Sequence, residues 1–229
     1  AAQTAHAALA NTISGYEPVT MIANPQDLTA ARNACAENVD VVALEIDDAW
    51  FRDSGPNYVI ENGELIATCW TFNGWGEKFV PFDKDATIAM RWAAHAGHKT
   101  RKINMVLEGG SLNVDGAGTL ITTEQCLLHP NRNPKLSRDQ IAERLCSELG
   151  QRRVVWLPFG LALDDDTDGH VDNVAAFIGE KTVIMQGCDD KNESDFSRCA
   201  TNISVAKDAG LIVHEIPVCE QRFKYVTVP

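Results

Sequence analysis

The sequence predicts an α/β fold in which similar units of strands and one helix stack around a common axis. Three observations lead to this prediction. A pattern of strand, polar loop, hairpin and helix occurs three times, a glycine stands at the turn of each hairpin, and helical patterns separate the copies. Such units bury their apolar faces only against neighbouring units. The chain has 229 residues, 45% of them hydrophobic, and we expect residues 1–229 to form one such domain.

The first copy begins with the predicted strand VVALEI, residues 41–46, which runs into a polar loop. The stretch NYVIENGELIATCW, residues 57–70, follows, and its Asn62-Gly63 pair predicts a hairpin turn between two strands. Apolar side chains at helical spacing in DKDATIAMRWAAHAG, residues 83–97, predict the helix that completes this copy.

The second copy repeats this plan. Its strand and hairpin are predicted in INMVLEGGSLNVDGAGTLITT, residues 103–123, with Asp115-Gly116 at the turn. The helix follows in SRDQIAERLCSELG, residues 137–150, where Ser137 begins a capping arrangement ahead of the apolar stripe.

The third copy contains the strand RVVWLPFG, residues 153–160, an acidic loop, and the hairpin VDNVAAFIGEKTVIMQ, residues 171–186, with Gly179 at the turn. A helix is predicted over 194–209. The strand LIVHEIPV, residues 211–218, is expected to begin a fourth unit, and the chain ends at Pro229 before a ring of units would close. We therefore expect an incomplete array that belongs to a longer protein.

Loops that follow equivalent strands converge on the axis of such an array. Glu45, Glu108 and Asp166 occupy equivalent loops in the three copies. Residues far apart in the sequence are thus expected to lie near one another: Asp47, Asp48, Asp53, Glu108 and the segment 164–172.

The acidic segment DDDTDGHVDN, residues 164–173, has five aspartates and one histidine in ten positions. Adjacent carboxylates repel one another, so either they are solvated or a cation lies among them. Asp164, Asp166, Asp168 and Gly169 match the start of a calcium-binding EF-hand loop. Its twelfth position is Ala175, where a bidentate glutamate is needed, so calcium is not expected.

Zinc bound through His170 and Asp172 is not supported by the sequence, because no second histidine or cysteine has suitable ligand spacing. We expect neither a metal nor a cofactor. The cysteines are odd in number and never spaced C-x-x-C, which is typical of reduced thiols in a cytoplasmic protein. They are Cys35, Cys69, Cys126, Cys146, Cys188, Cys199 and Cys219.

A formal net charge of -12 and a pI near 4.9 disfavour nucleic acids and anionic membranes as partners. No apolar run approaches the length needed to cross a bilayer, and the first residues lack the pattern of a secretory signal. The sequence thus predicts a soluble cytoplasmic protein.

Four motifs together resemble the agmatine deiminases, which belong to a guanidine-modifying superfamily that also contains the bacterial peptidylarginine deiminases. These motifs are DDAWFRDSGP (47–56), FNGWGEKF (72–79), EGGSLNVDGAGTLITTEQCLLHPNRNPKLS (108–137) and DTDGHVDN (166–173). The resemblance covers most of the chain. It implies the pentein fold, an α/β propeller of pseudo-fivefold repeated β-β-α-β units, which is incomplete here.

The resemblance also implies an activity. Such enzymes hydrolyse a guanidinium to a ureido group with loss of ammonia, and agmatine yields N-carbamoylputrescine in polyamine biosynthesis. Their nucleophile is a cysteine in a glycine-rich motif near the C-terminus. That motif is absent here, so the isolated chain is expected to be inactive. A peptidylarginine or arginine deiminase and a non-catalytic guanidine-binding protein are the alternatives, and a homo-oligomer is left open.

By the same resemblance, Asp53 and Asp172 hold the planar guanidinium through paired, charge-assisted hydrogen bonds. His170 protonates the departing nitrogen and later deprotonates water, as imidazole can near neutral pH. Glu108 orients His170 and favours its protonated form. For His170 taken alone, the alternative is a structural histidine with satisfied hydrogen bonds.

Further residues are assigned to substrate binding. Trp50 provides a flat wall, unless it belongs to the core at a strand end. Asp47 and Asp166 are placed near a distal ammonium group, which favours agmatine over substrates that carry an α-carboxylate. Gly109, with Gly110, allows close approach of the backbone or forms only a tight turn. The neighbouring Asp164 and Asp165 are expected to be a solvated face.

Overall fold

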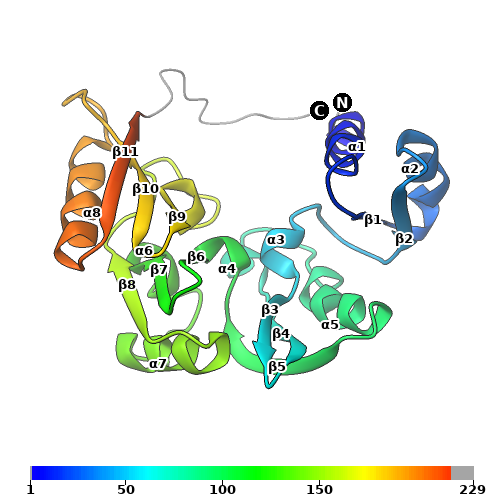
Figure 1. Cartoon of the computed structure of the whole chain (residues 1–229), viewed down its shortest axis with the longest axis horizontal. Helices are drawn as coiled ribbons and strands as arrows, with labels where there is room; N and C mark the ends of the chain where they lie inside the picture. Colours follow the sequence, from blue (N-terminus) through cyan, green and yellow to red (C-terminus); the bar gives the residue numbers. More distant parts are fainter. Residues whose placement is uncertain (1, 218–229) are drawn as a thin grey trace.

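The computed structural model describes residues 2–217, and within that range the strands form four separate β-sheets. Figure 1 shows that the sheets and their helices follow one another along an open arc, with the first and last units at its two ends. This arrangement agrees with the predicted incomplete propeller. Within residues 2–217, no helix combines the length and the apolar character needed to cross a bilayer.

The first unit contains a two-stranded parallel sheet and two helices that the sequence analysis did not predict. Its elements are α1 (Ala2–Ile13), β1 (Val19–Ala23), the 3-10 helix η1 (Pro25–Asp27), α2 (Leu28–Ala34) and β2 (Val39–Ala43). The strand predicted at 41–46 is β2, which pairs with β1. Ala10, Val39 and Val41 are buried between the helices and the sheet. The first predicted copy therefore begins at the last strand of the first unit.

The other three units share one plan. An antiparallel hairpin is followed by a helix and by a third strand, which pairs in parallel with the second strand of the hairpin. The second unit contains β3 (Asn57–Glu61), β4 (Glu64–Thr71), α5 (Asp85–His95) and β5 (Lys99–Val106). The third contains β6 (Leu112–Val114), β7 (Thr119–Thr123), α7 (Arg138–Leu149) and β8 (Arg153–Leu157). The fourth contains β9 (Ala175–Gly179), β10 (Thr182–Gly187), α8 (Phe196–Asp208) and β11 (Ile212–Pro217).

The β-β-α-β unit that the resemblance implies is thus present, but the unit boundaries predicted from the repeat were wrong. The leading strands of the second and third predicted copies are β5 and β8, which close the sheets of the preceding hairpins by pairing with β4 and β7. The strand expected to begin a new unit at 211–218 is β11, and it closes the sheet of the preceding hairpin by pairing with β10. A strand that follows a crossover helix returns to the same sheet, as in other parallel β-α-β connections. The remainder of the predicted fourth unit, residues 218–229, lies outside the described residues.

Local turn and cap chemistry accounts for the hairpins and for α7. Asn62 and Gly63 both have positive φ, as the predicted two-residue turn requires. The third hairpin turns one residue later than predicted, because Gly179 still belongs to β9 and Lys181 has the positive φ. Ser137 and the side chain of Gln140 complete the predicted capping box of α7.

Short helical turns between the strands carry the functional side chains. They are α3 (Phe51–Ser54), α4 (Gly74–Glu77), η2 (Gly109–Ser111), α6 (Glu124–Leu127) and η3 (Val171–Asn173). Helix α3 packs against η2, and η2 packs against η3. Loops from three units therefore meet at one place.

Candidate active site

Three titratable side chains surround Gly110 in η2. A methyl group at Gly110 would lie 2.5 Å from His170 Nδ1, 2.7 Å from Asp172 Oδ2 and 2.8 Å from Asp53 Oδ1. These atoms come from three segments, namely α3, the end of the acidic loop and η3. All three distances are shorter than an ordinary van der Waals contact, so only glycine leaves room for them.

Asp53 is buried and held by two donors. The backbone N–H of Gly110 donates to Oδ1 at 2.9 Å, and Trp75 Nε1 donates to Oδ2 at 2.9 Å. Trp75 lies in α4 with φ 54°, a left-handed conformation that a bulky residue rarely adopts. Trp75 belongs to the motif FNGWGEKF (72–79), in which no residue was predicted to have a role. Both donors fix the orientation of the Asp53 carboxylate.

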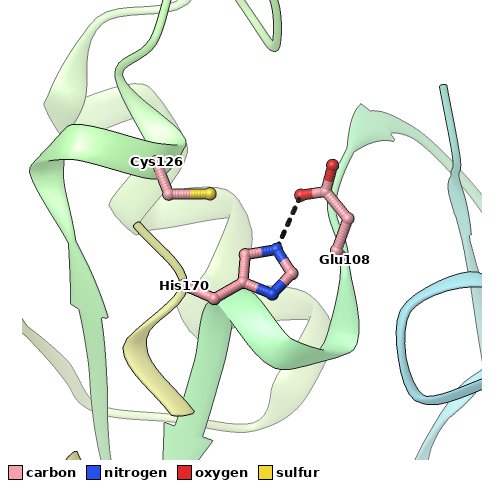
Figure 2. Close-up of side chains that lie close together, drawn as sticks. All are labelled: Glu108, Cys126 and His170. Atoms are coloured by element: carbon pink, nitrogen blue, oxygen red, sulfur yellow. Dashed lines mark ion pairs between the residues drawn. The ribbon is translucent and has the colours of Figure 1, made fainter. Parts of the chain in front are cut away.

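His170 and Glu108 form a buried pair, which Figure 2 shows together with Cys126. The distance from His170 Nε2 to Glu108 Oε2 is 3.8 Å, which is an ion-pair distance and too long for a hydrogen bond. On the other side of the ring, His170 Nδ1 lies 3.8 Å from Asp53 Oδ1. Burial by itself lowers the pKa of His170, but Glu108, Asp53 and Asp172 raise it above its ordinary value. The neighbouring carboxylates therefore favour the protonated form of the imidazole.

Arg132 is a residue of this site that the sequence analysis missed. Its side chain is completely buried, with Nε 2.7 Å from Glu108 Oε1 and Nη1 2.8 Å from Asp168 Oδ2. Nη2 also donates to the carbonyl oxygen of Thr167 at 3.1 Å. Arg132 lies in the family motif at 108–137, so the signal was present as an arginine within that motif. Its guanidinium links Glu108 to the acidic loop.

The acidic loop is stabilised by its own aspartates. The carboxylate of Asp164 accepts hydrogen bonds from the backbone N–H groups of Thr167, Gly169 and His170. The expectation that Asp164 is solvated is therefore wrong, because the backbone amides of the loop occupy its oxygens. Asp165 is exposed, as expected.

Asp172 is exposed as a residue, although its Oδ2 approaches Gly110. Desolvation of the carboxyl group raises the pKa of Asp172, His170 lowers it, and the neighbouring Asp53 raises it, with a net increase. Two carboxylates that face the same point repel each other. A cation between Asp53 and Asp172 would relieve this repulsion.

The residues assigned to substrate binding are more widely spread. Trp50 precedes α3 and is 61% exposed, so the alternative that it belongs to the core is wrong. Asp47 Oδ2 accepts a hydrogen bond from the backbone N–H of Lys84, and Asp166 is exposed. Among the described residues, none of the contacts that the structure shows joins Asp47 or Asp166 to His170.

Gly109 lies against the chain that carries Asp53. A side chain at this position would clash with the backbone carbonyl of Arg52. Gly109 therefore allows the backbone of η2 to pack closely against the backbone of α3.

Cys126 in α6 is the cysteine of the described residues that lies against His170 and Glu108. Burial and the Glu108 carboxylate raise the pKa of the Cys126 thiol well above its usual range. A catalytic nucleophile needs the thiolate, so Cys126 is poorly suited to that role.

The comparisons with known proteins assign the family. The sequence model of the Porphyromonas-type peptidyl-arginine deiminases matches residues 1–227. The chain belongs to this family. An agmatine deiminase of Stutzerimonas stutzeri is 44% identical over 230 residues, and one of Pseudomonas putida is 41% identical over the same length. These matches cover 95% of the chain but only 62% of each relative.

Solved structures confirm the predicted α/β propeller fold. The agmatine deiminase of Enterococcus faecalis superposes with a TM-score of 0.91 at 33% identity, covering 97% of this chain and 64% of that one. An agmatine deiminase of C. jejuni with substrate bound gives a TM-score of 0.89 at 29% identity, covering 97% of this chain and 66% of that one. The family member described here thus spans about two thirds of the length of these enzymes.

Proposed function

We propose that this chain forms the larger part of an agmatine deiminase, a hydrolase that converts agmatine and water into N-carbamoylputrescine and ammonia. The observation that carries this proposal is the convergence of Asp53, His170 and Asp172 on Gly110. The names of the relatives support agmatine as the substrate. The nucleophilic cysteine is proposed to lie outside these 229 residues.

Asp53 and Asp172 bind the guanidinium. One oxygen of each carboxylate lies close to Gly110, and a planar cation offers paired N–H donors to both carboxylates. Since the two negative charges repel each other in the absence of a cation, the guanidinium is attracted by relief of that repulsion. The exposed ring of Trp50 provides a wall for the substrate, and Asp47 and Asp166 are proposed to face the distal ammonium group.

His170 transfers protons through Nδ1, the nitrogen that faces Asp53 and Gly110. After a thiolate attacks the guanidinium carbon, the imidazolium donates a proton to the departing nitrogen, the C–N bond breaks and ammonia leaves. The neutral imidazole then takes a proton from water, which attacks the same carbon and displaces the thiolate. Glu108 stabilises the imidazolium, and Gly109 keeps η2 in place beside α3.

Several broader properties belong to the same proposal. The described units are part of one propeller domain, to which the whole chain 1–229 belongs. The enzyme works without a cofactor in the cytoplasm, and its product leads to putrescine. We propose neither a nucleic-acid partner nor a membrane partner, and homo-oligomers are compatible with the site.

Three variants of the full-length gene product test the proposal. In Asp53→Asn and Asp172→Asn, circular dichroism should remain unchanged while ammonia release from agmatine falls severely, because one charged pair to the guanidinium is lost. His170→Ala should lower turnover by at least about 10²-fold, as expected for loss of a general acid and base. Asp165→Asn, on the exposed part of the same loop, is the matched control and should remain active.

The outcomes that contradict the proposal are specific. Near-normal turnover in either Asn variant would exclude the proposed binding of the guanidinium by Asp53 and Asp172. Full activity of His170→Ala would exclude His170 from the mechanism. Faster release of ammonia from arginine or a peptidylarginine than from agmatine would assign the alternative substrates. The isolated 229 residues should show no turnover, and steady multiple turnover would place the nucleophile among their own cysteines.

A further inference from the structure

Glu108, Cys126 and His170 form a buried cluster of potential metal ligands. Each offers one ligand atom, and these atoms all lie within 4.8 Å of one another. Glu108 follows β5, Cys126 belongs to α6 and His170 precedes η3, so three separate segments contribute. Figure 2 shows the Cys126 thiol and the Glu108 carboxylate beyond the same edge of the imidazole ring, the edge whose nitrogen the dashed line joins to Glu108.

Two of the three ligand atoms are unsatisfied. His170 Nε2 and Glu108 Oε2 are buried, and among the described residues neither has a hydrogen-bond partner. A buried polar atom without a partner costs about 1–3 kcal/mol, so its presence calls for an explanation. The two atoms are 3.8 Å apart. Nitrogen and oxygen ligands of one tetrahedral zinc ion lie about 3.3 Å apart, given metal–ligand distances of about 2.0–2.2 Å. A shift of a few tenths of an ångström in each side chain would bring them to that separation.

We propose that Glu108, Cys126 and His170 bind a divalent metal ion that accepts sulfur and nitrogen ligands, of the Zn²⁺ type. A thiolate and an imidazole select such ions over Mg²⁺ and Ca²⁺, which prefer oxygen ligands. Three protein ligands leave the fourth position of a tetrahedral ion open for a water molecule. When the ion binds, the S–H bond of Cys126 is broken, its proton passes to solvent, and a metal–sulfur bond forms.

The surroundings hold the three ligands in place. Arg132 binds the other oxygen of Glu108, Oε1, and leaves Oε2 directed at the cluster. Thr123 Oγ1 accepts a hydrogen bond from the backbone N–H of Cys126 and donates one to the carbonyl oxygen of Gly169. The backbone of Cys126 and the backbone of the loop before His170 are therefore bound to the same side chain. Such partners orient metal ligands and raise affinity.

The local charge also favours a cation. The carboxylates near His170 belong to Glu108, Asp53 and Asp172, whereas two guanidiniums act on them, Arg132 on Glu108 and Arg52 on Asp172. The negative charges therefore outnumber the positive charges at the cluster, even though Arg132 opposes a second cation beside Glu108.

An ion at this site would inhibit the enzyme, a consequence that rests on the proposed function. The metal would occupy Nε2 of His170, so the ring would remain neutral with its proton on Nδ1. A ring in this state cannot accept the proton of the attacking water. Bound metal should therefore block turnover in the full-length protein.

The test is a titration of the reduced 229-residue chain, free of any affinity tag, with Co²⁺ and then Zn²⁺. We expect one equivalent of Co²⁺ to produce a sulfur-to-cobalt charge-transfer band in the near ultraviolet, and Zn²⁺ to remove it. Cys126→Ser should abolish the band. Cys146→Ser, which changes a partly buried cysteine of α7, is the matched control and should retain it. Far-ultraviolet circular dichroism checks that each variant folds.

Absence of the band from the wild-type chain would overturn the proposal, and so would a band that persists in Cys126→Ser or disappears in Cys146→Ser. If Cys126→Ser does not fold, His170→Ala keeps the thiol and should bind Co²⁺ at least about 10–100-fold more weakly, the loss typical of even an outer-shell change. Unchanged affinity there would equally refute the site. The spectrum does not depend on turnover, so its result is separate from that of the proposed function.

Discussion

Replacing Arg132 with methionine should destabilise the chain far more than loss of an ordinary surface ion pair. The Arg132 side chain is completely buried, and its guanidinium contacts Glu108 Oε1 at 2.7 Å and Asp168 Oδ2 at 2.8 Å. Methionine fills a similar volume but cannot pair with either carboxylate. Glu108, which is also completely buried, would lose its closest cation.

The expected magnitude follows from that burial. Removing one partner of a buried ion pair costs about 3–5 kcal/mol, because the remaining charge is uncompensated in a poorly solvated position. Lys207 and Glu215 provide a matched comparison, since their ion pair at 3.2 Å has both side chains about half exposed. Lys207→Met should cost no more than about 1 kcal/mol, the upper end for exposed pairs.

Urea unfolding followed by circular dichroism measures both changes on the same chain. The double variant Arg132→Met with Glu108→Gln completes the cycle, and it should be less destabilised than the sum of the two single variants because no buried charge is left unpaired. If the free energy of unfolding of Arg132→Met falls by less than about 1 kcal/mol, the reasoning is refuted. Such a result would mean that the variant compensates the buried charge of Glu108 in another way.

Two further predictions concern single positions. Gly110→Ala in the full-length protein should lower turnover of agmatine by about 10²-fold, because the new methyl group would displace site atoms now 2.5–2.8 Å from its position. Gly179→Ala, whose methyl group would meet nothing nearer than 3.9 Å, should be fully active, and equal turnover in the two variants would contradict the argument from crowding. Burial alone would raise the pKa of Asp115, but hydrogen bonds donated mainly by backbone N–H groups lower it overall. Its stabilising effect is therefore present above the unfolded-state pKa of about 3.9 and lost as the pH falls through the lower folded-state value. Asp115→Ala should cost about 1–3 kcal/mol in urea unfolding at pH 7 and clearly less near pH 3, whereas a cost independent of pH would refute it.

The parts of the fold that depend on neighbours in the chain could be predicted from the sequence. Asn62-Gly63 specifies its hairpin because both residues tolerate positive φ, and Ser137 begins α7 through hydrogen bonds that span three residues. The succession of strand, loop, hairpin and helix was recognisable because it repeats. Most of the first unit was missed, since its strands Val19–Ala23 and Val39–Ala43 pair in parallel and no hairpin turn marks them; only the second of these strands was predicted.

The sequence by itself thus determined the repeated α/β architecture, the acidic character of the loops and the motifs that carry the family resemblance. Tertiary structure alone decided which strand closes each sheet, because β11 could as well have begun a new unit as joined β10. It also decided that Arg132 pairs with Glu108 and that Cys126 lies beside His170. Spacing along the chain carries no sign of these contacts, since they arise only when loops from different units meet and exclude water.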